Sequence, residues 1–82
     1  MPGALRVGDV DNAGDSMSQG STNVFVNGKG LCSIGDKDSR GDSLTSGSGN
    51  VTINGKPAGR IRDADSRGHV KISGSANVNI NQ

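Results

Sequence analysis

Asn50-Val51-Thr52-Ile53-Asn54-Gly55-Lys56 lies near the middle of this 82-residue chain and decides its fold. Its apolar residues alternate with others at the two-residue period of a half-buried strand. The Asn-Gly pair near its end favours the positive φ angles of a tight hairpin turn. Two sister segments share the pattern, Asn23-Val24-Phe25-Val26-Asn27-Gly28-Lys29 and Asn77-Val78-Asn79-Ile80-Asn81. We expect β-hairpins with Val and Ile facing inward, the middle strand position facing solvent, and a second short strand that holds Ile34 or Ile61.

The whole chain repeats with the spacing of this segment. Gly20, Gly47 and Gly74 are spaced by 27 residues, without an insertion between copies. A constant spacing of this kind indicates equivalent structural units, here approximately 5–31, 32–58 and 59–82 of a single domain, 1–82. Further triplets in register are Asp9/Asp36/Asp63, Asp11/Asp38/Asp65, Gly14/Gly41/Gly68 and Ser21/Ser48/Ser75.

The two ends of the chain complement each other. The third copy stops at Asn81-Gln82, before its turn, whereas Leu5-Arg6-Val7-Gly8-Asp9 is a second strand without its first. Pairing of the N- and C-terminal strands would close a pseudo-threefold ring and remove exposed strand edges. We therefore predict an all-β fold, a small pseudo-threefold cone of three 27-residue hairpin repeats, with no helix. The symmetry should be imperfect at Val70-Lys71-Ile72, where the apolar residue changes position relative to Met17 and Leu44.

Composition limits the core and the classes of partner. Only 29% of residues are hydrophobic and Phe25 is the single aromatic residue, so the core must be thin. Cys32 is the only cysteine, which excludes an internal disulfide and leaves a metal ion or a partner chain as the support that small domains need. The net charge of +1, without a basic stripe, argues against a nucleic-acid partner. The chain has neither an apolar run of ~20 residues nor a signal peptide, so we expect it to be made as a soluble protein in the cytoplasm.

The segment Val51-Thr52-Ile53-Asn54-Gly55-Lys56-Pro57-Ala58-Gly59-Arg60 resembles the signature of the PAAR-repeat proteins, named for Pro-Ala-Ala-Arg, with Gly59 in place of one Ala. The equivalent segments, Gly3-Ala4-Leu5-Arg6 and Gly30-Leu31-Cys32-Ser33, match less closely. The Val7-Gly8-Asp9 and Ile34-Gly35-Asp36 that follow them match the family, as does a Gly-Ser-x-Asn-Val element in every copy. The resemblance covers essentially the whole chain.

The resemblance implies a structural tip that sits as a monomer on a trimeric β-helical spike protein. We also expect no enzymatic activity, because a nucleophile and a base would need a specific pocket, and a thin cone with one His offers little concave volume. Such proteins cap the membrane-piercing central spike of contractile injection systems, both phage tails and type VI secretion systems. The tip would be assembled into a virion tail baseplate, or secreted on a type VI spike, and would touch the target-cell envelope transiently. A chain without a toxin-like extension favours the phage tail. The alternative is a metal- or carbohydrate-binding adhesive module on a larger assembly, which would bind its ligand without a spike.

A metal site near the apex is a further expectation. Family members commonly use three His and one Cys there, whereas this chain has one His, and Cys32 lies outside the apical loop. By the repeat, His69 corresponds to Asp15 and Asp42, and threefold symmetry would bring the three toward one axis. One imidazole and two carboxylates suit iron and also zinc. Two other interpretations stay open: polar residues exposed at the tip, or a His–carboxylate pair without metal.

The remaining candidates have structural alternatives. Val24, Val51 and Val78 are equivalent residues that either contact the spike or belong to the core. Cys32 corresponds to Leu5 and Gly59, which favours a buried small hydrophobe. The Asp-rich loops begin like a calcium loop, but Gly occupies the position of the bidentate Glu, which favours turn stabilisation.

Overall fold

The computed structural model describes residues 3–80, and among them it contains strands and isolated bridges but no helix. β1 (Phe25–Val26) pairs with β2 (Lys29–Gly30), and β3 (Thr52–Ile53) pairs with β4 (Lys56–Pro57), both antiparallel. The all-β prediction is confirmed. No helix in this part of the chain is long and apolar enough to cross a membrane.

The turns of the two hairpins have the geometry that Asn-Gly favours. Asn27 and Gly28 have φ angles of 54° and 78°, and Asn54 and Gly55 have φ angles of 51° and 81°. Two successive positive φ angles define the hairpin turn whose twist matches that of the flanking strands. The hairpins therefore form where local chain chemistry predicts them.

Two expectations about strands were wrong in detail. Ile34 and Ile61 lie in turns and not in strands. The bridged residues come just before them in the chain: Leu31 and Ser33, and Ala58 and Arg60. The predicted third strand, as far as the structure describes it (residues 77–80), forms one antiparallel bridge, from Asn79 to Gly3, and the Ala4 N–H donates to the Val78 carbonyl at 2.9 Å. The predicted pairing of the two chain ends is thus present as a bridge. Asn81, the last residue of the predicted third strand, lies outside the described residues.

Bridges between successive copies recur at equivalent positions. One set joins Arg6 to Leu31, Ser33 to Ala58, and Arg60 to Ala4. A second set joins Met17 to Asp38, Leu44 to Asp65, and Lys71 to Asp11. In each set the third bridge returns to the first copy, so the backbone pairs form two closed sets of three.

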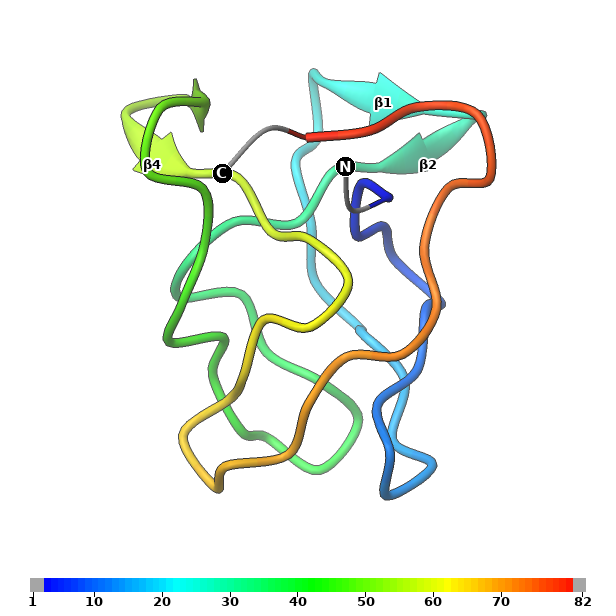
Figure 1. Ribbon diagram of the computed structural model, residues 1–82, viewed down its shortest axis with the longest axis vertical. Helices are drawn as coiled ribbons and strands as arrows, with labels where there is room; N and C mark the ends of the chain where they lie inside the picture. The colour runs from blue at the N-terminus through cyan, green and yellow to red at the C-terminus, as the bar shows by residue number, and fades with distance from the viewer. Residues whose placement is uncertain (1–2, 81–82) are drawn as a thin grey trace.

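The core consists of two small apolar clusters. The first contains Ala4, Val26, Leu31, Ala58 and Ile80, and it lies toward the end of the molecule that carries the hairpins (Figure 1). The second contains Leu5, Met17, Cys32 and Leu44 and confirms Cys32 as a buried small hydrophobe. The Asp-rich loops of the three copies lie at the end opposite the hairpins (Figure 1). We call these the hairpin end and the loop end.

The strand side chains face as predicted, with one exception. Phe25, in the middle strand position, is 59% exposed, whereas Val26 and Ile80 are buried. Val24 and Val51 pack against the first cluster, but their counterpart Val78 is 36% exposed. The three equivalent valines therefore do not share one environment.

The 27-residue spacing of glycine has a steric cause. A Cβ on Gly47 would lie 2.9 Å from the Ala58 carbonyl oxygen, and one on Gly74 would lie 2.8 Å from the Ala4 carbonyl oxygen. We expect Gly47→Ala to lower the free energy of unfolding by about 1–3 kcal/mol, because backbone atoms must move to admit the methyl group. Chemical denaturation followed by circular dichroism measures this.

The control is Gly49→Ala, since the equivalent residues Thr22 and Ala76 carry side chains. It should change the free energy of unfolding by less than about 0.5 kcal/mol. Equal effects of the two substitutions would contradict the steric explanation.

Candidate functional site

The three Asp-rich loops are each closed by an equivalent buried carboxylate. Asp11 Oδ1 accepts hydrogen bonds from the backbone N–H groups of Ala13 and Asp15, both at 2.9 Å. Asp38 and Asp65 bind their own loops in the same way, through Arg40, Asp42, Arg67 and His69. The turn-stabilising role predicted for these loops is therefore confirmed. We call Asp11, Asp38 and Asp65 the carboxylate ring.

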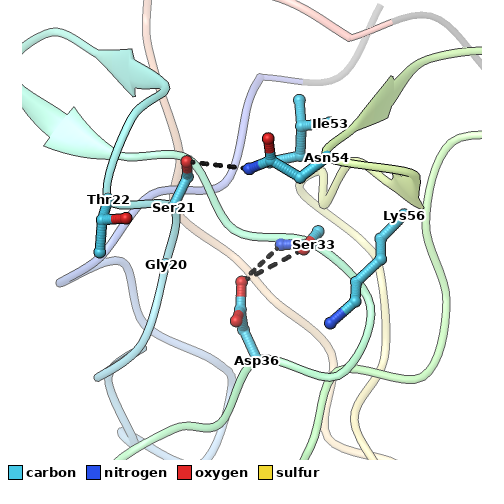
Figure 2. Close-up of a pocket in the computed structure, with 8 residues that line it drawn as sticks. All are labelled: Gly20, Ser21, Thr22, Ser33, Asp36, Ile53, Asn54 and Lys56. Atoms are coloured by element: carbon cyan, nitrogen blue, oxygen red, sulfur yellow. Dashed lines mark hydrogen bonds between the residues drawn. The ribbon is translucent and has the colours of Figure 1, made fainter.

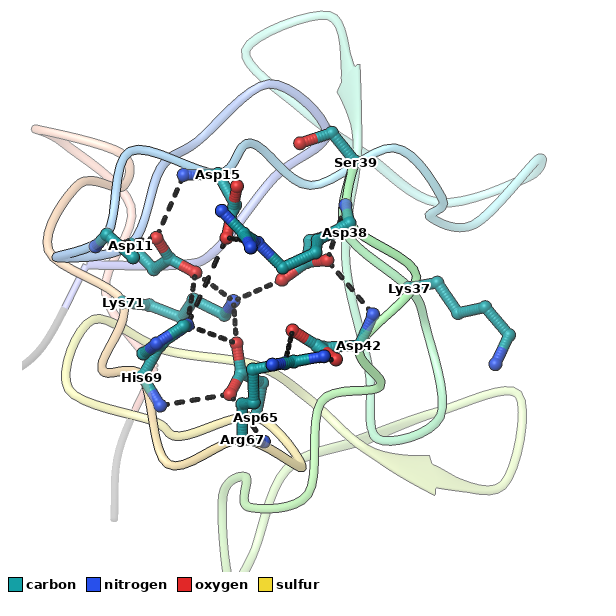
Figure 3. Close-up of polar contacts among 12 residues, drawn as sticks. Asp11, Asp15, Lys37, Asp38, Ser39, Asp42, Asp65, Arg67, His69 and Lys71 are labelled. Carbon is teal, nitrogen blue, oxygen red and sulfur yellow. Dashed lines mark hydrogen bonds and ion pairs between the residues drawn. The ribbon is translucent and has the colours of Figure 1, made fainter.

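The second oxygen of each ring carboxylate faces one ammonium group (Figure 3). Lys71 Nζ lies 3.4 Å from Asp11 Oδ2, 3.5 Å from Asp38 Oδ2 and 3.3 Å from Asp65 Oδ2. All four side chains are buried, and Lys71 is only 1% exposed. The structure thus places a single cation at the centre of three carboxylates.

Lys71 takes the buried position that an apolar residue fills in the other copies. Its counterparts Met17 and Leu44 belong to the second core cluster. The neighbouring Ile72 is 56% exposed and does not replace them. Because the stem of a lysine is aliphatic, it can pack where Met and Leu pack while its charge reaches the ring. The break in symmetry predicted at Val70-Lys71-Ile72 is therefore a change from apolar side chain to cation at one buried position.

The charges of this cluster stabilise one another. Burial raises the pKa of Asp11, but hydrogen bonds from the backbone of Asp15 and Ala13 and the charge of Lys71 lower it more, so it lies below its usual value. The pKa of Asp65 is lowered by the same balance. For Lys71, burial lowers the pKa, while the hydrogen bond and charge of Asp65 and the charge of Asp11 raise it more. All three groups are thus ionised at neutral pH.

These directions set the pH dependence of stability. Because the pKa values of Asp11 and Asp65 are lowered, both groups stabilise the fold when the pH lies above their unfolded-state pKa values. This stability is lost as the pH falls through their folded-state pKa values. The raised pKa of Lys71 adds stability that is lost as the pH rises through its folded-state value. Between these limits the cluster favours the folded chain.

Two ion pairs lie outside the ring. Arg40 Nε is 2.9 Å from Asp15 Oδ2, and Arg67 Nε is 3.2 Å from Asp42 Oδ2, so each loop carboxylate pairs with an arginine of the next copy. The third such position has His69 in place of Asp. The arginine that would pair with it is replaced by Ala13. The first and third copies therefore lack both the aspartate and the arginine of this ion pair, so neither charge is left without its partner.

His69 lies close to two carboxylates of the ring and to Asp15. Its Nδ1 is 3.8 Å from Asp11 Oδ2, 3.8 Å from Asp65 Oδ2 and 4.0 Å from Asp15 Oδ2. These distances exceed a hydrogen bond. Within the described part of the chain, this buried nitrogen has no hydrogen-bond partner.

The residues predicted to bind metal lie at the loop end, in two overlapping groups. His69 and Asp15 group with Asp11, and His69 and Asp42 group with Asp65, with one ligand atom of each residue within 4.8 Å of the others. Metal–ligand distances near 2 Å place ligands roughly 3–4 Å apart, so these clusters could hold a metal ion. Two features oppose metal binding here. Lys71 repels a dication, and arginines already bind Asp15 and Asp42. The carboxylate ring also forms a group of this kind, but Lys71 Nζ lies among its oxygens.

Sequence reasoning missed the carboxylate ring and Lys71. The available signal was the lysine itself, since a charged residue at a repeat position that is otherwise Met or Leu must find buried partners. The equivalent aspartates were recognised, but only as turn residues. Each carboxylate has two oxygens, so it can stabilise its turn with one and bind the lysine with the other.

Among the described residues, Cys32 belongs to none of the groups that could hold a metal ion. Burial raises the pKa of its thiol to about 12, and the charges of Asp36 and Asp9 act in the same direction. The thiol donates to the Gln19 carbonyl at 3.2 Å. Cys32 is therefore a protonated core residue, not a reactive thiolate.

No protein-family model matches the chain, and no curated protein matches it. The likeness to the PAAR-repeat proteins consequently rests on the motifs and spacing of the sequence, and the functions that it implies are proposals.

We expect Lys71→Met to lower the free energy of unfolding by about 3–5 kcal/mol at neutral pH, because it leaves three buried carboxylates without their cation. Adding Asp38→Asn to it should recover part of the loss, since one of the repelling charges is removed. Urea denaturation of the two variants measures both effects.

Lys29→Met is the matched control, because Lys29 is exposed in β2. It should leave the unfolding midpoint unchanged. A Lys71→Met protein as stable as the original at neutral pH would show that the ammonium group is not needed.

Proposed function

We propose that the protein is the tip of a membrane-piercing spike, a small cone of three PAAR-like repeats that binds as a monomer to the end of a trimeric β-helical spike protein. The spike belongs to a contractile injection system, either a phage tail, where the tip is part of the virion baseplate, or a type VI secretion system. The observation that carries this proposal is the two closed sets of three equivalent bridges within one chain. A single chain with three similar faces can match a threefold partner in a one-to-three complex.

We assign spike contact to the hairpin end. Phe25 and Val78 are exposed large apolar residues, and Val26 and Ile80 lie just below the surface of the same end. Covering these side chains would extend a core that is thin for a domain of this size. Binding that requires the folded chain would also stabilise it by mass action.

The loop end then becomes the point that meets the target envelope. Its loops are held by the carboxylate ring and Lys71, and its surface carries the ion pairs of Arg40 and Arg67. A polar, internally bonded end suits a part that must enter a membrane surface without binding to it. The role is mechanical and requires no catalytic group.

We also propose that one metal ion, zinc or iron, binds near the apex at His69. The support is the buried Nδ1 of His69, which has no hydrogen-bond partner within residues 3–80, and its similar distances to Asp11, Asp15 and Asp65. The ion would lie outside Lys71, where Asp42 is also within reach of the cluster. It would add positive charge to a region in which the ring carboxylates outnumber the ammonium group.

The spike-tip proposal predicts a complex of one tip chain with one trimer of the β-helical spike protein of the same system. Mass photometry of the mixture measures the stoichiometry. Phe25→Asp and Val78→Asp together should weaken the complex at least about tenfold, because charges would enter an apolar contact. Val24 and Val51 are unsuitable for this test, because they pack on the core and their replacement would disturb folding.

Arg67→Gln, at the loop end, is the control and should bind the trimer with unchanged affinity. A complex that survives both changes at the hairpin end but is lost with Arg67→Gln would reverse the assigned orientation. Glycan binding by the isolated chain, with no complex on mixing with the trimer, would instead favour the adhesive module.

The metal proposal predicts a single zinc or iron ion per chain by elemental analysis of protein purified without a metal-binding tag. His69→Ala should abolish it, and Asp36→Ala, outside the cluster, should not. A chelator should remove the ion with little change in melting temperature, because Lys71 and the backbone N–H groups of the loops already hold the inner carboxylates. Equal metal contents in the original protein and in His69→Ala would contradict the site.

A further inference from the structure

Two arginines are held in equivalent places by equivalent contacts. Arg6 donates from Nε to Asp9 Oδ2 at 3.0 Å and from Nη2 to Asp9 Oδ1 at 3.1 Å. Arg60 makes the same two bonds to Asp63, at 3.1 and 2.8 Å. The arginine side chains are only 15% and 19% exposed. Two parallel bonds between a guanidinium and a carboxylate are both strong and geometrically specific.

The second copy retains the carboxylate but lacks the arginine. Ser33 stands at the position of Arg6 and Arg60, and it donates to Asp36 Oδ2, from its N–H at 2.8 Å and its hydroxyl at 3.4 Å. Asp36 is correspondingly more exposed than the buried Asp9 and Asp63.

The other oxygen of Asp36 has also lost its second donor. Asp9 Oδ1 accepts from the Ser73 hydroxyl, and Asp63 Oδ1 accepts from the Ser46 hydroxyl. The equivalent residue in the second copy is Gln19, whose side-chain oxygen accepts from the Lys37 N–H instead. Within residues 3–80, no hydrogen bond reaches Asp36 Oδ1.

A cavity of about 280 Å³ lies beside Asp36 (Figure 2). Gly20, Ser21, Ser33, Asn54 and Lys56 contribute to its lining. Two of its lining residues, Gly20 and Asn54, are the repeat counterparts of neutral groups that hold an arginine in another copy. Gly20 corresponds to Gly47, whose carbonyl accepts from Arg60 Nη2 at 2.9 Å, and Asn54 corresponds to Asn27, whose Oδ1 accepts from Arg6 Nη1 at 3.2 Å.

We propose that this cavity binds a guanidinium group, supplied by an arginine side chain of a partner protein. Asp36 provides the carboxylate, and Gly20 and Asn54 provide the neutral acceptors that the other two copies use. The Asn54 amide donates to Asn23 and Ser21 and would rotate to present its oxygen, as Asn27 does to Arg6. The site does not depend on the spike-tip function, because it follows from the comparison of the three copies alone.

Lys56 also lines this cavity, and its ammonium group would compete with a guanidinium for Asp36 (Figure 2). It is exposed, and its ammonium group cannot form the two parallel bonds of a guanidinium. The first copy has Lys29 at the same position and still holds Arg6 on Asp9. A lysine at this position is therefore compatible with a bound guanidinium.

The test uses the whole chain labelled with ¹⁵N and titrated with N-acetyl-arginine methylamide, which stands for an arginine in a polypeptide. We expect saturable shifts of the Gly20, Ser33 and Asp36 amide signals, with a Kd on the order of 1 mM, as for a contact of a few atoms. The capped citrulline of the same shape carries no charge and should give no saturable shift. Saturable shifts that are equal for the two compounds would overturn the proposal, as would their absence with arginine.

Two variants assign the binding to this cavity. Ser33→Arg supplies the guanidinium from within the chain, as in the other copies, so it should raise the melting temperature and abolish the titration. Asp36→Asn keeps an acceptor for the Ser33 N–H but removes the charge, and it should weaken binding at least about tenfold. Unchanged titration of either folded variant would place the binding elsewhere and refute the site.

A second ligand separates a partner protein from a small molecule. Agmatine is a free guanidine without a peptide backbone. Affinity for agmatine that is no more than about tenfold tighter than for capped arginine supports an arginine side chain as the occupant. Binding of agmatine more than about tenfold tighter would overturn that part of the proposal and indicate a small guanidine as ligand.

Discussion

The ammonium group of Lys71 inside the carboxylate ring is the interaction on which the loop end depends. Each ring carboxylate is committed to two backbone N–H groups of its own loop, so none can become apolar without loosening that loop. The three loops thereby place three buried charges within a few ångströms of one another. Replacing a buried ion cluster with apolar residues is often neutral for stability, but here the turns require the carboxylates and hence a cation.

The rest of the molecule is built with little apolar material. Its two apolar clusters are small, and the chain instead places backbone against backbone at the repeated glycines, where the carbonyl of a neighbouring segment leaves no room for a Cβ. Most of the long-range order consists of single bridges and backbone hydrogen bonds between copies. Rigidity of this kind comes from satisfied polar groups and close packing more than from hydrophobic volume.

The features that could be predicted from the sequence are those set by local chemistry or by exact repetition. Asn27-Gly28 and Asn54-Gly55 specify their own φ angles, and the alternation around Val26 specifies which side chains are buried. The lengths of the strands were overestimated, because alternation shows which face is buried but not how many residues pair. Lys71 escaped prediction for a different reason. Its partners come from three loops, Asp11, Asp38 and Asp65, and such a meeting depends on the axis of the fold.

The departures from the repeat also form compensating sets. His69 replaces an aspartate where Ala13 replaces its arginine, while Ser33 replaces an arginine whose aspartate is kept. The first change leaves the charges balanced within the chain. The second leaves Asp36 Oδ1 without a hydrogen bond from the described residues, whereas Arg6 and Arg60 donate to the equivalent oxygens of Asp9 and Asp63.

The position of Lys71 on the axis of three copies shows what covalent linkage of the copies permits. In an assembly of three identical subunits, every residue on the axis occurs three times, so a lysine there would bring three ammonium groups into contact. One continuous chain is free of that restriction and can place two apolar side chains and one cation at the same level, Met17, Leu44 and Lys71. The protein therefore repeats equivalent backbone bridges in its three copies, while a single substitution changes the charge of its interior.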